Sequence, residues 1–597
     1  MTPRLQGTSR IVRGAAPTLL ALLLSACATM PETPTGAPTA PSPDADRAEQ
    51  LYRDGEFEQA ARAFTDLANT RRGDVSAHYQ LRAAEALREN GDLDGAARLI
   101  DDIRRRRLHG DEPLRLDLLG AEVALKHGDA AHARALLVFD DSMTPGLRLR
   151  ALELRARADA AVGDAFASAQ TRAQLDRLLE GADREQNRGQ LLDTLGKLDA
   201  AALKSRYDSL QPNDPLRPWI EQALRKQGQA LAREMPRPSQ PVGTMRQGTG
   251  GALEAEGYER ARRVALLLPL NAQLAGVSNS IRDGFLSAYF ADTLERRPEV
   301  RIYDAGRTPA EAVAAYEKAV AEGADRVVGP LQRESVGELF HRPLSVRVLA
   351  LNHPDTGEVP PPGSAEYGLL PEAEGAQVAE RLRERGIARA SVILAEADWA
   401  ERAARAFRAQ FEAGGGTIVG ESRLREKDVN YATSITQATA SLGADGAVFI
   451  SMRPQQARLL APQLKIANVA APVFATSHIY SGDDNATLDR DLDGIEFCDA
   501  PWLFGPMTGK PERARISGQI ASANGVGARL FAFGMDAYAL LPYIDWLISH
   551  PESYLSGATG ELTADNFGRV HRLVSWARFV GGMAQPAEGA LSATPMQ

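Results

Sequence analysis

Apolar residues follow three different patterns along the chain. A single apolar run occupies 15–24. From 47 to about 231 apolar residues recur with the period of amphipathic helices, and from 258 onward short apolar runs of strand type alternate with such helices. Stretches rich in Pro, Gly, Ser and Thr lie between these parts. We interpret them as linkers, because such compositions bury too little apolar surface to fold. The predicted parts are a signal peptide at 1–26, a lipidated Cys and Pro-rich tether at 27–46, a helical domain at 47–235, a linker at 236–257 and an α/β domain at 258–597.

The helical part carries an internal repeat. A Gly-x-x-x-x-small motif recurs at intervals of 35 to 37 residues. Its glycines are Gly55, Gly91, Gly128 and Gly163, and the small residues that follow them are Ala60, Ala96, Ala133 and Ser168. A period of this length is typical of tetratricopeptide-like helical pairs, in which glycine ends one helix and a small residue lets the next helix approach closely. We expect an α-solenoid, because one such pair cannot bury its apolar face alone.

The part from 258 onward predicts parallel sheets covered by helices. Strand-like runs occur at Val264–Leu270, Arg326–Val328, Val346–Leu351, Ala390–Leu394, Gly446–Ser451 and Val473–Ala475. Between the first two runs, Thr308-Pro-Ala-Glu311 is a capping box, and Gly323 ends the helix that it begins. Continuous apolar strands separated by helices indicate an α/β fold. The length of this part suits two such sheets with a crossing near Leu369–Glu374, and therefore a bilobed architecture.

The start of the chain resembles a lipoprotein signal. Basic residues precede the apolar run, which is about half the ~20 residues that span a bilayer and ends in Leu24-Ser-Ala-Cys27. We expect cleavage before Cys27 and acylation of its thiol. Ala28 and Thr29 lack the Asp that retains bacterial lipoproteins in the inner membrane, so the sequence favours the outer membrane, facing the periplasm. An Ala-x-Ala-type cleavage that leaves Cys27 as a free thiol is the alternative.

Composition narrows the classes of partner. The 597 residues carry a formal net charge of -9, which argues against a nucleic-acid partner. With Cys27 acylated, Cys498 has no intrachain partner, so we expect it to be a buried structural thiol beside Phe497 in a strand-like stretch.

Two sets of motifs carry a family resemblance. Val264-Ala-Leu-Leu-Leu-Pro-Leu270 followed by Ile281-Arg-Asp-Gly-Phe-Leu286 resembles the opening strand and helix of type I periplasmic binding proteins. Ala475-Thr-Ser-His478, the stretch 530–538 and Thr559-Gly-Glu-Leu-Thr563 running on to Trp576 are similar to the LpoA (LppC) family of penicillin-binding protein activators. Nearly the whole mature chain matches that family's order of parts. The fold class that follows is a tetratricopeptide-like α-solenoid before a bilobed, periplasmic-binding-protein-like α/β domain.

The resemblance implies a regulator of cell-wall synthesis. Members of the family are outer-membrane lipoproteins whose C-terminal domain docks on a bifunctional class A peptidoglycan synthase and stimulates its transpeptidase. The resemblance therefore implies a class A penicillin-binding protein as partner, with peptidoglycan itself as a further candidate. It carries over no catalytic residue, because the family is defined by fold and partner. A lipid-anchored solute receptor for amino acids or wall peptides is the alternative reading of the same fold.

The sequence lacks the motifs of the enzymes that act on such substrates. Ser-x-x-Lys and Lys-Thr-Gly, which an acyl-enzyme transpeptidase needs, do not occur. Neither do His-Glu-x-x-His, the Gly-x-Ser-x-Gly elbow or a phosphate-binding Gly-x-x-x-x-Gly-Lys loop. A glycosidase carboxylate pair needs no fixed spacing, and nothing in the sequence points to one. We expect a protein that is not an enzyme and that uses no cofactor or metal.

A receptor of this fold would hold its ligand with hydroxyls and helix starts between the lobes. Asn271, Ser278, Ser280 and Tyr431 stand where such groups are expected, although the polarity of loops alone also explains them.

Overall fold

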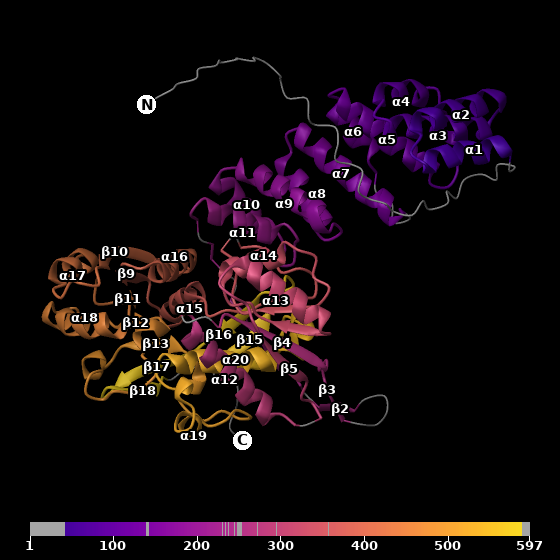
Figure 1. Cartoon of the computed structure of the whole chain (residues 1–597). Coiled ribbons are helices and arrows are strands. Elements are labelled where there is room, and N and C mark those ends of the chain that lie inside the picture. Colours follow the sequence, from indigo (N-terminus) through magenta and orange to yellow (C-terminus); the bar gives the residue numbers. More distant parts are fainter. Residues whose placement is uncertain are drawn as a thin grey trace, which may run out of the picture. The chain divides into compact units, whose positions relative to one another are not determined.

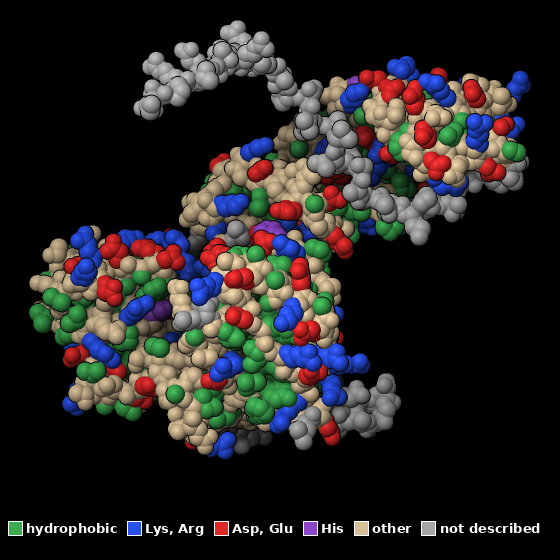
Figure 2. Space-filling model, viewed as in Figure 1, with side chains coloured by type: hydrophobic (Ala, Val, Ile, Leu, Met, Phe, Trp, Pro, Cys, Tyr) green, Lys and Arg blue, Asp and Glu red, His purple; other side chains and the backbone are tan. Residues whose placement is uncertain are grey.

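The chain forms two compact units, 1–178 and 179–597, according to the contacts between its residues. The computed structural model describes residues 42–138, 143–229, 231–232, 235–236, 238–243, 245–247, 253–270, 273–293, 295–355 and 357–587. Cys27 and Asn271 lie outside the described residues. Within these ranges no helix has the length and apolarity that crossing a membrane requires. Charged side chains of both signs are interspersed over the face shown in Figure 2.

The first unit is a series of helical hairpins (Figure 1). They are α1 (Pro43–Arg53) with α2 (Phe57–Thr70), α3 (Asp74–Glu89) with α4 (Leu93–Ile100), α5 (Glu112–Lys126) with α6 (Ala130–Leu136), and α7 (Pro145–Ala161) with α8 (Ala165–Asp176). The four glycines of the repeat form the turns, at φ between 79° and 85°. Ala60, Ala96, Ala133 and Ser168 are 0% exposed. The repeat predicted from the sequence is confirmed.

A buried ionic network joins three of these hairpins. Arg82 of α3 donates to Glu49 of α1 at 2.9 Å and to Glu85 of its own helix at 2.8 Å. Arg115 of α5 donates to the same Glu85 at 2.7 Å. Burial alone would raise the pKa of Glu85, but Arg115 and Arg82 outweigh it and lower this pKa to about 2. Successive hairpins are therefore linked by charge as well as by apolar packing.

The last three helices of the helical part make their contacts with the second unit. They are α9 (Gly181–Gly196), α10 (Ala200–Ser209) and α11 (Arg217–Lys226). Glu221 of α11 pairs with Arg569 at 2.6 Å, and Arg188 of α9 donates to the carbonyl of Phe340 at 3.4 Å. The contacts thus divide the chain earlier than 235, the predicted end of the helical domain. That the helical domain extends to residue 235 and folds independently of the rest stays a prediction.

The first lobe of the second unit is built on a parallel five-stranded sheet. Its order is β5 (Glu299–Asp304), β4 (Arg263–Leu268), β6 (Arg326–Val328), β7 (Val348–Ala350) and β8 (Ala365–Glu366). Val264, Leu266 and Leu268 pack on one face in the cluster that includes α12 (Ala275–Ala291) and α20 (Gly527–Leu540). Ala265 and Leu267 pack on the other face with α13 (Pro309–Ala321) and α14 (Arg333–Phe340). Alternate residues of one strand therefore serve two cores, as a sheet covered on both faces requires.

The second lobe has a seven-stranded sheet. Its order is β10 (Thr417–Leu424), β9 (Arg389–Ala395), β11 (Ala447–Ser451), β12 (Val473–Ala475), β13 (Glu496–Asp499), β17 (Ser575–Val580) and β18 (Met583–Pro586). The first five strands run parallel to one another, and β17 and β18 each run antiparallel to the strand before them in this order. The lobe also contains α15 (Pro371–Glu384), α16 (Asp398–Ala413), α17 (Ala432–Thr439) and α18 (Pro454–Ile466), and Figure 1 shows α16, α17 and α18 grouped around its strands.

Two smaller sheets complete the unit. One has the order β1 (Gln240–Pro241), β14 (Ser553–Ser556), β15 (Glu561–Ala564) and β16 (Val570–Leu573). The other pairs β2 (Met245–Gln247) with β3 (Leu253–Ala255). The short helices α19 (Arg513–Ser517) and α21 (Ile544–Ser549) lie in the connections around α20. Neither small sheet was predicted from the sequence.

Helices α12 and α20 cross at two glycines. A Cβ added to Gly284 would lie 1.9 Å from the carbonyl oxygen of Phe531, and one added to Gly534 would lie 2.0 Å from that of Ile281. Both glycines belong to the motifs that carry the family resemblance. The lack of a side chain at these positions, rather than a positive φ, sets how closely the two helices approach.

The main sequence predictions for this unit are confirmed. All six strand-like runs coincide with strands, and the capping box of Thr308 and Glu311 forms at the start of α13. Cys498 is a free, fully buried thiol in β13. The fold is α-helical hairpins followed by a two-lobed α/β part, as predicted.

Candidate functional site at the junction of the lobes

The chain passes between the lobes three times, and these passages define the candidate site. It crosses from β8 into α15, from β13 towards α20, and from β16 into β17. The first passage lies at the predicted crossing near 369–374. Each passage places a buried charged residue at the junction: Glu374 in α15, Asp536 in α20 and Arg572 in β16.

Glu374 links the first and third passages to the second lobe. Its carboxylate accepts from the backbone N–H of Ser477 at 3.0 Å and from the hydroxyl of Ser477 at 2.9 Å. Arg572 donates to it at 2.8 Å. Burial alone would raise the pKa of Glu374, but Arg572 and the other nearby positive charges lower it overall. Glu374 is therefore held as a carboxylate by groups that come from both sides of the junction.

Asp536 occupies the corresponding place on α20. Its carboxylate accepts from the backbone N–H groups of Ala558 and Thr559 at 2.5 and 2.8 Å, and from the Thr559 hydroxyl at 2.7 Å. The Tyr367 hydroxyl donates to it at 3.2 Å. Burial, and secondly the Asp536 charge, raise the pKa of Tyr367 well above its usual value. The long helix is thus fixed to the loop before β15 and to the end of β8.

Two further contacts close the junction. Arg529 of α20 donates to Asp499 at the end of β13 at 2.7 Å and to the carbonyl of Ser477 at 3.0 Å. Gln377 of α15 donates to the carbonyl of Arg572 at 3.0 Å and accepts from the N–H of Val574 at 2.9 Å. Each passage between the lobes is therefore anchored by side chains from elements distant in the sequence.

A stacked pair lies beside Glu374. The rings of Trp399 and His478 are parallel within 10°, with their centroids 4.1 Å apart. Burial, together with the positive charges of Arg529 and two other arginines, lowers the pKa of His478 to about 4, although Glu374 opposes the shift. Its Nδ1 makes no hydrogen bond within the described part of the chain and lies 4.0 Å from a Glu374 oxygen. The imidazole is therefore neutral near pH 7.

The junction is suited to holding the lobes and not to catalysing a reaction. Glu374 and Asp536 already accept three and four hydrogen bonds, so neither carboxylate is poised to take a proton from a substrate. Among the described residues no group of three or more His, Cys, Asp or Glu side chains is arranged to hold a metal ion. What the geometry provides is a fixed relation between two lobes, which presents their surfaces in one arrangement.

The ligand candidates from the sequence lie elsewhere or are already bonded. Ser278 and Ser280 are buried in α12, where their hydroxyls donate to the carbonyls of Pro269 at 2.5 Å and Gly276 at 3.1 Å. Tyr431 is 1% exposed in the core of the second lobe; its N–H donates to Gln463 at 2.7 Å, and its hydroxyl makes no hydrogen bond within the described residues. The two serine hydroxyls therefore serve the structure of their own segment, and Tyr431 contributes to the core. Burial raises the pKa of Cys498, which keeps it an unreactive thiol.

Sequence reasoning missed the junction residues. Asp536 offered a signal, since it is the single charge within the apolar stretch 530–541. A lone carboxylate in such a helix is buried at a cost unless it is hydrogen-bonded. Glu374 and Arg572 offered only their places, one at the predicted crossing and one in the family-like stretch that runs to Trp576, and each lies among other charged residues of its segment.

Comparison with known proteins finds similarity across both units. The family described as "LppC putative lipoprotein" matches residues 59–582. A penicillin-binding protein activator LpoA from Photobacterium profundum is 30% identical over 356 residues, which are 54% of this chain and 57% of that relative. A relative of the same name from Glaesserella parasuis is 24% identical over 598 residues, which are 95% of this chain and 96% of the relative. A solved structure of LpoA from Haemophilus influenzae is 19% identical, covers 88% of this chain and 97% of its own, and has a TM-score of 0.48.

Proposed function

Since the chain belongs to the LppC family, we propose that it binds a class A penicillin-binding protein and stimulates the transpeptidase activity of that peptidoglycan synthase. The observation that supports this most is the full-length similarity to a relative named as a penicillin-binding protein activator, over 95% of this chain and 96% of the relative. A match of that extent includes the helical hairpins and both lobes, so the whole order of parts is shared.

The junction, whose buried carboxylates already accept hydrogen bonds from the protein itself, supports the proposal that this chain acts through its partner. A protein that only binds shifts its partner towards the active state by its differential affinity for that state, at about 1.4 kcal/mol for each tenfold shift. Such a regulator benefits from a surface that is already arranged before binding, because less ordering free energy is lost in the complex. The bonded carboxylates of Glu374 and Asp536 provide that preorganisation.

We propose that the protein is located at the outer membrane, on its periplasmic side. This location is supported by the basic residues, the apolar run and Leu24-Ser-Ala-Cys27, and by the residues after the cysteine. Acylation of Cys27 with two or more chains would anchor the protein stably, since one chain holds only reversibly. Metabolic labelling with a fatty-acid probe tests this: label should enter the natural chain and not Cys27→Ala. Label that persists in the variant would reject the site.

The activity is tested by titrating the full-length chain onto a purified class A synthase with lipid-linked substrate. We expect the crosslinked product per unit time to rise and to level off near one activator per synthase. Glycan polymerisation measured in the same samples separates a transpeptidase effect from a general one. No binding and no change of rate with any class A synthase of the same cell would reject the activator and favour the solute receptor.

A further inference from the structure

A cavity at the amino ends of the first lobe's strands is lined by two cations, Arg296 and Lys510, and by one carboxylate, Asp292. It has a volume of about 240 Å³ and lies beside Ala261 and Pro298, which precede β4 and β5. Its other walls come from the last turns of α12 and α20, from β14 and from the loop 509–511. In open α/β sheets ligands bind outside the carboxyl ends of the strands, so this cavity is distinct from that crevice.

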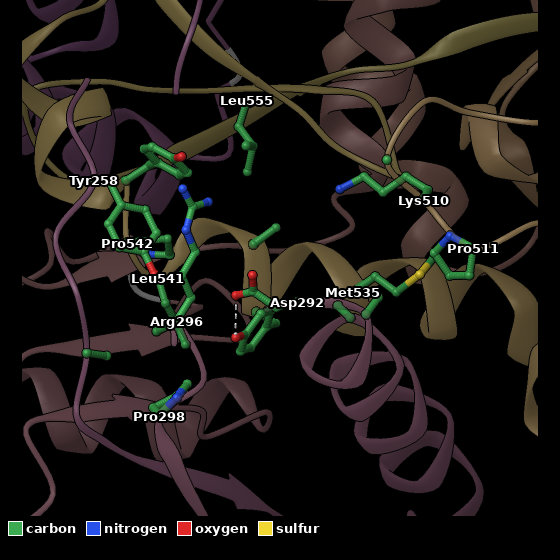
Figure 3. A pocket seen from close by; sticks show the side chains of 17 residues that line it. Tyr258, Asp292, Arg296, Pro298, Lys510, Pro511, Met535, Leu541, Pro542 and Leu555 are labelled. Atoms are coloured by element: carbon green, nitrogen blue, oxygen red, sulfur yellow. Dashed lines mark hydrogen bonds between the residues drawn. The ribbon is translucent and has the colours of Figure 1, made fainter. Parts of the chain in front are cut away.

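The walls are largely apolar and aromatic. Tyr258 and Tyr543 meet edge to face with their ring centroids 5.7 Å apart. Met535, Leu541 and Leu555 add aliphatic surface (Figure 3). Such a lining removes an apolar ligand body from water, while a few placed polar groups fix its orientation.

Arg296 enters the cavity from the first lobe. Its guanidinium lies over the Tyr258 ring, 4.8 Å from the ring centroid. Within the described ranges its side chain forms no ion pair. Asp292, which also lines the cavity, accepts from the Tyr538 hydroxyl at 2.9 Å and from the N–H of Thr293 at 2.8 Å. Arg296 is exposed, so its donors are open to solvent and to a ligand that enters the cavity.

Lys510 enters from the opposite side (Figure 3). Its side chain is only 14% exposed, and the nearest carboxylate oxygen among the described residues, on Asp536, is 3.9 Å from its ammonium. That distance is too long for a hydrogen bond, and Asp536 already accepts four others. The loop that carries Lys510 is held in place, because the buried indole of Trp502 donates to the carbonyl of Pro511 at 2.8 Å. The ammonium is therefore ion-paired at a distance with Asp536 but makes no hydrogen bond within the described residues, so its donors remain open to water or to a ligand.

We propose that this cavity binds a small carboxylate, with the carboxylate group between Arg296 and Lys510 and an apolar body against Tyr258, Tyr543 and Leu555. The guanidinium supplies directional donors, and the ammonium supplies a compact charge. Because Lys510 belongs to a loop rooted in the second lobe, such a ligand would contact both lobes and lie next to Asp536 of the junction. The carboxylate belongs either to a free organic acid or to the C-terminus of a short peptide.

Binding is tested on the full-length chain with two pairs of probes. One pair is 3-phenylpropanoate and its uncharged amide, and the other is the dipeptide alanyl-alanine and its C-terminal amide. We expect at least one acid to bind in a saturation-transfer NMR titration, and its amide to bind about tenfold more weakly or not at all, because charge-assisted hydrogen bonds are the stronger ones. Binding of the dipeptide alone would assign the ligand to peptide ends, and binding of 3-phenylpropanoate alone to free acids.

Variants locate the site. Arg296→Gln and Lys510→Gln should each weaken binding of that acid by about tenfold. Arg260→Gln is the matched control, because Arg260 is exposed, is close in sequence to Tyr258 and does not line the cavity. A thermal unfolding curve for each variant confirms that it folds. The proposal is overturned when neither acid binds the natural chain, or when the natural chain and the Arg296→Gln/Lys510→Gln double variant bind equally well.

Discussion

The helical hairpins of 42–178 and the lobes of 179–587 achieve order in opposite ways. In the hairpins each turn lies within one repeat, as at Gly91, and the apolar and ionic contacts join helices of the same repeat or of neighbouring repeats. In the lobes the decisive contacts join residues far apart in sequence, such as Glu374 with Arg572. We therefore expect a substitution in the first unit to lower the stability of its own repeat and its neighbours only. In the second unit a few buried residues each hold more than one passage between the lobes, so a substitution there should affect both lobes.

The largest expected effect comes from cutting the chain at the linker. A fragment of 258–597 lacks α9–α11, so Arg569 loses Glu221 and the surface under these helices becomes exposed. Compared with 179–597, its free energy of unfolding should be lower by about 5 kcal/mol, the order expected for the lost apolar burial beneath these helices together with the lost ion pair. Urea titrations followed by circular dichroism measure the difference. Equal stability of the two fragments would show that the unit begins at the linker after all.

The next effect comes from the junction. Arg572→Met should lower the free energy of unfolding by about 3–5 kcal/mol, because it leaves the buried Glu374 carboxylate without its cation. The double variant Glu374→Gln/Arg572→Met should recover part of the loss, since no buried charge then remains unpaired at this position. A double-mutant cycle in urea measures the coupling. Additive losses would mean that the two side chains do not act as a pair.

Two glycine substitutions compare the units directly. Gly534→Ala should cost about 3 kcal/mol, because the added Cβ would meet the backbone of α12. Gly91→Ala should cost only about 1–2 kcal/mol, since there the obstacle is a φ of 81° with open space around it. Gly146→Ala, within α7 and in open space, serves as the control and should be neutral or slightly stabilising. Thermal unfolding of the three variants ranks them, and a larger loss at Gly91 than at Gly534 would contradict the comparison.

The smallest effect concerns pH. The pKa of His478 is lowered to about 4 from 6.5, so its neutral form stabilises the fold above about pH 6.5, and this contribution is lost as the pH falls towards 4. The loss should be about 2 kcal/mol, reduced from the full shift because 31% of the side chain is exposed to solvent. His478→Phe keeps a ring on Trp399 but has no proton to bind. Its stability should fall less between pH 7 and 4, and parallel curves for the two proteins would reject the role of His478.

The same contrast explains what the sequence predicts well. The hairpins were predictable because glycines and small residues recur with one period, and the central strands because their runs are apolar on both faces. Strand β5 was missed because four of its six residues, Glu299, Arg301, Ile302 and Asp304, are exposed at the sheet edge. The junction was missed because a charge such as Glu374 becomes meaningful only when folding brings Ser477 and Arg572 beside it. The candidates at Ser278 and Ser280 failed because a hydroxyl in a helix bonds readily to the carbonyls of its own segment.

The most direct test of the proposed activator asks which unit carries the contact with the synthase. Purified class A synthase is titrated with the full-length chain, with 179–597 and with 42–178, and the rate of crosslinking is measured at each ratio. We predict that 179–597 reaches the same plateau as the full-length chain near one activator per synthase, because the lipid and the hairpins chiefly raise local concentration. The fragment 42–178 should leave the rate unchanged. A rise produced by 42–178, with none produced by 179–597, would contradict the assignment of the activating contact to the two-lobed unit.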